Sequence, residues 1–293
     1  MERLAALIRH LQERRRKYRT PILAATFVLF LTGAVVSYRH LGIDPRDLRL
    51  APLALLVALI VPSLFYGGVG LVLLARSSGL RLRLPEATIT SAYAYLAELL
   101  PIPGGAIVRA TALVRVGGNV RDSSLLVILT AILWISLAMI GAGLTLLSHG
   151  SLVALPMASI GAALTLAITT WLWRKAGATI AGLTLAHRVA GIALNALRLH
   201  FAFAVFGLSI EISETLPFVL ALLLGSASSI APAGLGVSES LAALAAASSH
   251  YAPGTAFLAV GLDRVLCLAG CAIVALLGQV RTAKPAVCIP GEA

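Results

Sequence analysis

Two short breaks interrupt the apolar stretches of this chain, and they constrain its fold more than any other feature. The first is residues 100–105 (LPIPGG) and the second is residues 230–236 (IAPAGLG). Proline removes a backbone donor, and glycine permits turns that other residues resist, so no helix runs straight through either break. At bilayer depth such backbone is tolerated only where protein buries it or where it lines a polar cavity. We therefore predict that both breaks are tips of helical hairpins that enter a membrane and turn back.

The composition places the whole chain in a membrane. Of its 293 residues 59% are hydrophobic and 12% charged, and the mean hydropathy is +0.96. This predicts an all-α polytopic membrane protein and leaves no room for a soluble catalytic domain. The first apolar run is too long for a cleaved signal peptide, so we expect it to remain as an anchor. Cys267 and Cys271 lie one turn apart in an apolar helix, where packing is the expected role.

The apolar runs predict about six transmembrane helices plus two re-entrant helical hairpins. The spans are expected at 22–38, 51–75, 123–147, 152–173, 178–207 and 254–278. The hairpins are expected at 85–118 and 215–249, because no arm reaches the ~20 residues that a crossing helix needs. Residues 20–280 then form a single transmembrane domain, preceded by a basic segment at 1–19 and followed by a tail at 281–293.

Basic residues indicate the orientation. Residues 1–19 hold seven of them and form either an amphipathic helix on an anionic leaflet or a solvated topology signal. With the amino terminus inside, 16 basic residues fall in inside positions and three in outside loops. The positive-inside rule then places both termini in the cytoplasm, which suggests a bacterial or archaeal cytoplasmic membrane. The net charge of +11 reflects this asymmetry, and we expect no nucleic-acid partner.

An internal repeat relates the halves of the chain, about 20–148 and 151–280. A shift of 131 residues places Pro101 on Pro232, Gly105 on Gly236 and hairpin on hairpin. Each half makes an odd number of crossings, so the halves have inverted topology. Interrupted apolar segments at matching places in such halves point to a transporter's binding site. The tips, with Pro103 in the first, are expected to meet near the midplane, where half-helix N–H groups favour an anion.

Charges at membrane depth are costly, so they are functional candidates. Arg109 follows the first tip, where its guanidinium can grip a phosphate or pair with a carboxylate, Glu98 or Glu239. Glu98 is expected either to pair with an arginine or to cap the tip. Glu239 either complements a helix dipole, forms a gating ion pair or couples proton movement. Asp263 and Arg264 are adjacent on one helix, so they either bond to other spans or neutralise each other.

The span at 178–207 carries a polar stripe. Its members follow helical spacing: His187, Arg188, Gly191, Asn195 and Arg198. Such a stripe must face the protein interior or a wet cavity, either as glue between helices or as a path for an anionic headgroup. The scattered histidines show no metal-ligand spacing, so we expect no metal or cofactor.

The two tips also resemble a known family. Residues 99–109 (LLPIPGGAIVR) and 231–239 (APAGLGVSE) resemble motifs of the lysylphosphatidylglycerol synthase transmembrane family, and residues 262–265 (LDRV) resemble a third. The resemblance covers about 20–280, with departures at Ala233, Leu235 and Ser238. It implies a flippase-like module that moves a lipid between leaflets. The family's aminoacyl-transferase domain is not part of this sequence, so we do not expect lysyl transfer.

The sequence therefore predicts a lipid transporter rather than an enzyme. Its substrate would be an anionic phospholipid or a polyprenyl-phosphate-linked lipid, and its partners the bilayer, a second copy or a pathway enzyme. Substrate contacts are expected from Arg109, Arg188, Asn195, Arg198, Arg264 and the backbone of Gly104, Gly105, Gly234 and Gly236. Gating or ion-pair roles are expected for Glu98, Glu239 and Asp263. A membrane-embedded transferase and an accessory scaffold remain the alternatives.

Overall fold

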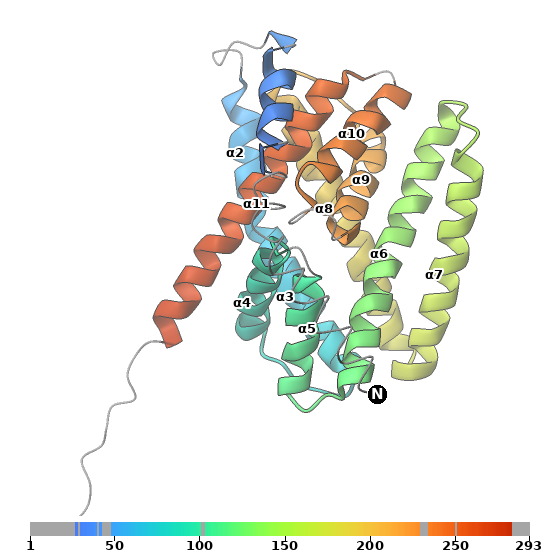
Figure 1. Ribbon diagram of the computed structural model, residues 1–293. Helices are drawn as coiled ribbons and strands as arrows, with labels where there is room; N and C mark the ends of the chain where they lie inside the picture. The colour runs from blue at the N-terminus through green and yellow to red at the C-terminus, as the bar shows by residue number, and fades with distance from the viewer. Residues whose placement is uncertain are drawn as a thin grey trace, which may run out of the picture.

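The computed structural model describes residues 27–28, 30–39, 41–42, 48–100, 103–228, 234–249 and 251–282. Within these ranges the regular structure is helical and contains no strand, which confirms the predicted all-α class (Figure 1). The expected basic segment at 1–19, the tail beyond residue 282, and the tip prolines Pro101 and Pro232 lie outside the described residues.

The described chain contains long helices that run through the bundle and short helices that form pairs. The long helices are α3 (Ile60–Ser77), α6 (Val120–Ser148), α7 (Ala154–Ala176), α8 (Ala178–Val205) and α11 (Pro253–Thr282), and α2 (Leu50–Ala58) leads directly into α3. The short helices are α4 (Leu84–Ala97), α5 (Gly104–Arg115), α9 (Leu216–Ser228) and α10 (Val237–Ser248), with a 3₁₀ turn η2 (Ser213–Thr215) before α9.

Five segments of the described chain are long and apolar enough to cross a bilayer. They are Leu50–Ser77, Val120–Ser148, Ala154–Ala176, Ala178–Val205 and Pro253–Gln279. Each matches a predicted span to within a few residues, so the prediction of a polytopic helical membrane protein is confirmed. Of the remaining predicted span, 22–38, the described part is helical. Its Phe30 ring stacks on Phe257 of α11, with ring centroids 6.1 Å apart.

A pair of short helices flanks each break. Helices α4 and α5 have 14 and 12 residues, and α9 and α10 have 13 and 12, so each arm is too short to cross a bilayer. Glycines let the arms touch where they meet. A Cβ on Gly104 would lie 2.1 Å from the Ala97 carbonyl oxygen, and one on Gly225 would lie 2.6 Å from Ser238 Cα. Only glycine fits at these two crossings.

The hairpins approach each other from opposite ends of the molecule. Figure 1 shows α4 and α5 in the lower half and α9 and α10 in the upper half. The helix bounds follow the predicted shift of 131: α4 moved by 131 becomes 215–228, and α9 is 216–228. Likewise α6 moved by 131 becomes 251–279, where α11 begins at residue 253. The helix bounds of the two predicted halves thus follow the same order and spacing.

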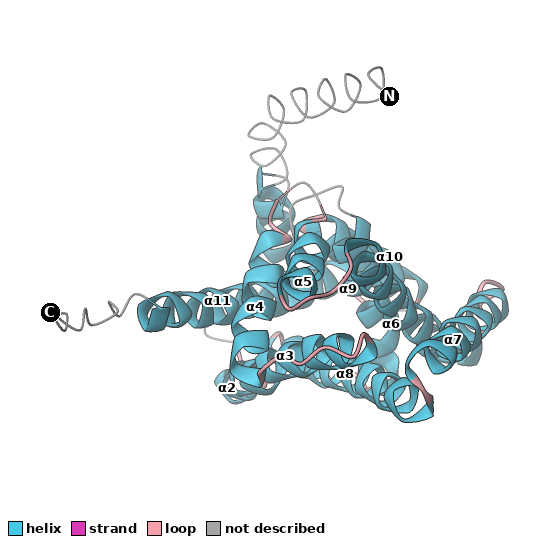
Figure 2. Ribbon diagram, turned by 90° about the horizontal axis from the view of Figure 1, so that it is seen from below, coloured by secondary structure: helices cyan, strands magenta, loops and turns pink. Residues whose placement is uncertain are grey.

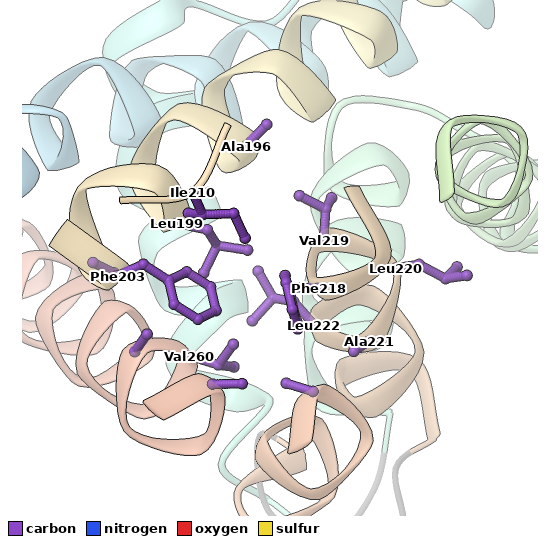
Figure 3. Close-up of a cluster of buried hydrophobic side chains, with 14 of the residues drawn as sticks. Ala196, Leu199, Phe203, Ile210, Phe218, Val219, Leu220, Ala221, Leu222 and Val260 are labelled. Atoms are coloured by element: carbon purple, nitrogen blue, oxygen red, sulfur yellow. The ribbon is translucent and has the colours of Figure 1, made fainter. Parts of the chain in front are cut away.

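Two apolar clusters hold these helices together. The larger one joins α6, α8, α9, α10 and α11 around Phe203 and Phe218, whose rings lie 4.9 Å apart (Figure 3). The smaller one joins α3, α4, α5, α6, α7 and α8 around Leu71, Leu113 and Leu172. The larger cluster packs the second hairpin into the bundle, and the smaller one seats the first.

Candidate functional site

A cavity of about 440 Å³ lies at the centre of the fold. Helices α3, α4, α5, α6, α8, α9 and α11 contribute to its wall. Seen along the bundle in Figure 2, α3 and α8 run along one side, with α4, α5 and α9 along the other. The wall is mostly apolar, but Glu98, Arg109, Arg188 and Arg198 interrupt it. An apolar chamber with a few cations suits an amphiphile with an anionic group.

The first hairpin supplies an ion pair to this cavity. Both terminal nitrogens of Arg109 lie 3.4 Å from Oε1 of Glu98, across the tip between α5 and α4. The side chain of Arg109 is 31% exposed and that of Glu98 is 20% exposed, so water reaches both. Gly105 makes room for this pair, because a Cβ there would lie 2.6 Å from Glu98 Oε1. Pro103 and Gly105 line the cavity, while Gly104 is buried against α4.

The predicted polar stripe of α8 faces the cavity along its whole length. His187, Arg188, Gly191, Asn195 and Arg198 all line the wall, which confirms that the stripe points inward. Asn195 donates through Nδ2 to the Gly191 carbonyl at 2.8 Å. His187 Nε2 lies 3.0 Å from the Tyr66 carbonyl oxygen, so this imidazole joins α8 to α3.

Arg198 is held by a carboxylate from α11. Its Nε and Nη2 donate to Oδ1 and Oδ2 of Asp263 at 2.9 Å and 2.6 Å, and its Nη1 donates to Ser63 Oγ at 3.2 Å. The side chains are 7% and 1% exposed. This two-point pair is a strong geometry for a buried arginine. Arg198 therefore borders the cavity with its charge already balanced.

Glu239 of the second hairpin and its neighbour Arg264 do not line the cavity. Glu239 Oε2 accepts the Gly236 N–H at 2.7 Å, so this carboxylate caps its own helix, as one of the sequence alternatives proposes. Arg264 Nε lies 3.9 Å from Glu239 Oε1, and both side chains are almost fully buried. Arg264 also donates to the Gly234 carbonyl at 3.0 Å and to Ser238 Oγ. Arg264 thus anchors the tip of the second hairpin to α11.

These contacts revise several expected roles. Arg264, Gly234 and Gly236 do not line the cavity in this structure, and the Arg264 guanidinium instead donates to Gly234 and Ser238. Asp263 and Arg264 do not neutralise each other; each bonds to a different element, as helix geometry requires for adjacent residues.

Two aromatic residues join the site without any sequence signal. Tyr66 of α3 stacks on His187, with ring centroids 4.0 Å apart and planes 5° from parallel. Trp134 of α6 places its ring 5.3 Å from the Arg188 guanidinium carbon. Both lie within apolar spans, where nothing in their neighbours distinguishes them from packing residues. Only the folding of three separate spans brings them to Arg188.

The described residues contain no group of three His, Cys, Asp or Glu side chains placed to hold a metal ion. No protein-family model matches the chain, and a search of curated proteins finds no match. Membership of the lysylphosphatidylglycerol synthase transmembrane family therefore stays a prediction that rests on the tip motifs.

Proposed function

We propose that this protein translocates a lipid with an anionic headgroup across the cytoplasmic membrane. The observation that carries this proposal is the central cavity, about 440 Å³ in volume and mostly apolar, into which three arginines project. A cavity of this character accepts the polar group of a lipid while the chains remain among apolar side chains and bilayer.

The two hairpins support movement between leaflets. In transporters with inverted repeats, interrupted segments from the two halves meet at the substrate, and one half rocks against the other. Here the α4–α5 pair contributes to the cavity wall, while the α9–α10 pair is fixed to α11 by Arg264. The larger apolar cluster seals the side of the second hairpin, and Leu222 belongs to both that cluster and the cavity wall.

Charge at the helix ends supports an orientation. α3 ends with Arg76, α5 with Arg115 and α7 with Arg174 and Lys175 in their last turns. These helix ends lie together at the bottom of Figure 1, beside the base of the first hairpin. By the positive-inside rule this end is cytoplasmic. The headgroup would then enter the cavity from the cytoplasmic leaflet.

Translocation is measured in proteoliposomes that contain NBD-labelled phosphatidylglycerol, with dithionite added to bleach the outer leaflet. The runs are made without a gradient, with a pH gradient and with a potassium diffusion potential. We expect the protein to speed translocation above protein-free vesicles in at least one condition. Arg109→Ala should lower that rate at least tenfold, because it removes a cavity cation and leaves the Glu98 carboxylate unpaired beside an anionic headgroup.

Arg115→Ala is the matched control, since Arg115 lies on the same helix but is exposed at its end. It should leave the rate unchanged. Transport at the protein-free rate under every condition, or an undiminished rate for Arg109→Ala, would contradict the proposal.

A further inference from the structure

Three unpartnered hydrogen-bond donors converge on one part of the cavity wall. Among the described residues, Arg188 Nε, Tyr66 Oη and Trp134 Nε1 are buried without a hydrogen-bond partner. All three residues line the cavity, and they come from α8, α3 and α6. Buried donors almost always find an acceptor, because an unmade hydrogen bond costs about 1–3 kcal/mol. Three such donors in one place indicate that the acceptor is a ligand.

Contacts among the three residues show that they form one cluster. The Arg188 guanidinium carbon lies 5.3 Å from the centre of the Trp134 ring, and the Tyr66 and Trp134 ring centres are 5.8 Å apart. Gly191, one turn after Arg188, leaves the space for the Tyr66 hydroxyl, because a Cβ there would lie 2.1 Å from Oη. Stacking on His187 fixes the Tyr66 ring. The cluster is therefore held rigidly from three helices.

The chemistry of the donors defines the ligand. The Tyr66 hydroxyl can accept from Arg188 as well as donate, whereas arginine and the indole N–H are donors with no acceptor capacity. An acceptor with several oxygens therefore completes the cluster. Arg188 carries the positive charge, and no described carboxylate forms an ion pair with it, whereas Arg109 pairs with Glu98 and Arg198 with Asp263. Since two of the three cavity arginines are balanced, one positive charge remains.

We infer that Arg188, Tyr66 and Trp134 form the binding site for a phosphodiester, the singly charged headgroup of a lipid. The inference rests on the proposed function, which it deepens by naming the substrate class and the residues that hold it. One phosphate oxygen accepts from Arg188 Nε, and others accept from Tyr66 Oη and Trp134 Nε1. A phosphodiester carries one negative charge, which matches the single unbalanced cation. A phosphate monoester brings up to two, and a zwitterionic headgroup brings no net charge.

Binding to the full chain in dodecyl maltoside tests the site apart from transport. The probe is NBD-labelled phosphatidylglycerol, followed by fluorescence anisotropy. It is displaced by dioctanoyl phosphatidylglycerol, by a short polyprenyl phosphoglucose, by dioctanoyl phosphatidic acid and by dioctanoyl phosphatidylcholine. The first two are phosphodiesters with a net charge of one negative unit, the third is a phosphate monoester, and the fourth is a phosphodiester whose choline cancels the charge. The first two should compete at least tenfold better than the last two. Whichever of the first two competes better identifies the source of the phosphodiester, a glycerolipid or a polyprenyl lipid.

The variants assign the contacts. Arg188→Gln should weaken phosphodiester binding about 10- to 100-fold, the usual effect of losing a hydrogen bond to a charged group. Tyr66→Phe and Trp134→Phe should each weaken it about 3- to 10-fold. Arg174→Gln, at an exposed arginine in the last turn of α7, is the control and should bind as the wild type does.

Thermal unfolding separates a binding role from a structural one. Without ligand, Arg188→Gln should unfold at the same temperature as the wild type or higher, because it removes a half-buried cation that has no described carboxylate partner. A large drop in that temperature, or binding of Arg188→Gln within threefold of the wild type, would overturn the site.

The two proposals fail in different ways. Binding that depends on Arg188 without translocation by the wild type would refute transport and leave the site standing. Translocation that Arg188→Gln leaves undiminished would refute the site and leave transport standing. Equal competition by all four lipids would refute the assignment to a phosphodiester with one net negative charge.

Discussion

The buried pair of Arg198 and Asp263 allows a quantitative test of what holds this fold together. The pair makes two direct hydrogen bonds, at 2.9 Å and 2.6 Å, and Arg198 has a third contact to Ser63 at 3.2 Å. Replacing Asp263 by Leu removes both bonds to the carboxylate and leaves the guanidinium with Ser63. Hydrogen bonds to charged groups contribute about 1.5–3 kcal/mol each. Two of them give about 3–6 kcal/mol, in line with the 3–5 kcal/mol typical of a broken buried pair.

The double variant should behave differently from either single one. Arg198→Met and Asp263→Leu should each lower the free energy of unfolding by about 3–5 kcal/mol, because each leaves one buried charge unpaired. Combining them removes both charges and fills the space with apolar atoms, so the double variant should lie within about 1 kcal/mol of the wild type. The difference is a coupling free energy of several kcal/mol between the two sites.

Equilibrium unfolding in mixed dodecyl maltoside and SDS micelles, followed by circular dichroism, measures these differences. The control is the partly exposed pair of Lys175 and Asp122, whose atoms lie 3.4 Å apart. Asp122→Asn there should cost at most about 1 kcal/mol. Single losses at Arg198 or Asp263 below that value, or a double variant as unstable as the sum of the single ones, would refute the reasoning.

Two further predictions concern the first hairpin tip and the loop between α10 and α11. Gly104→Ala should destabilise the protein by about 1–3 kcal/mol in the same unfolding assay, since its Cβ would lie 2.1 Å from the Ala97 carbonyl oxygen. Gly182→Ala, where nothing lies within 4 Å, should not destabilise it; equal effects of the two would contradict the close crossing. In the loop, burial and the hydrogen bond to Glu214 raise the pKa of Tyr251 to about 12. The contribution of this contact to stability should be complete below pH 10 and lost as the pH rises through about 12. In a spectrophotometric titration, the difference between the wild type and Tyr251→Phe should therefore show a midpoint near 12, and one near 10 would contradict the contact.

The helices of this protein were predictable from the sequence because their bounds depend on local residues. The ion pairs were not, because they depend on contacts between helices. Helix bounds depend on the apolar runs and on the Pro-Gly breaks, so α4 ends before LPIPGG and α5 begins at its first glycine. Polar spacing on one helix showed that the stripe around Arg198 faces inward. The partner of each arginine depends on which side chain another helix presents, and periodicity carries no information on that. Adjacent positions on a helix point about 100° apart, so Asp263 and Arg264 reach different elements.

The sequence by itself determined that this chain is a helical membrane protein with two interrupted hairpins in matching halves. In a bilayer every spanning segment must satisfy its backbone hydrogen bonds internally, so it must be a helix. The length of each helix and the position of each break can therefore be predicted from the apolar runs and the Pro-Gly breaks. Only the tertiary structure decided which cavity arginines lie beside a described carboxylate and which one does not. Arg109, Arg198 and Arg264 have carboxylates nearby, whereas Arg188 meets Tyr66 and Trp134. That distribution depends on the packing of helices distant in sequence, which brings the three unpartnered donors to one wall of the cavity.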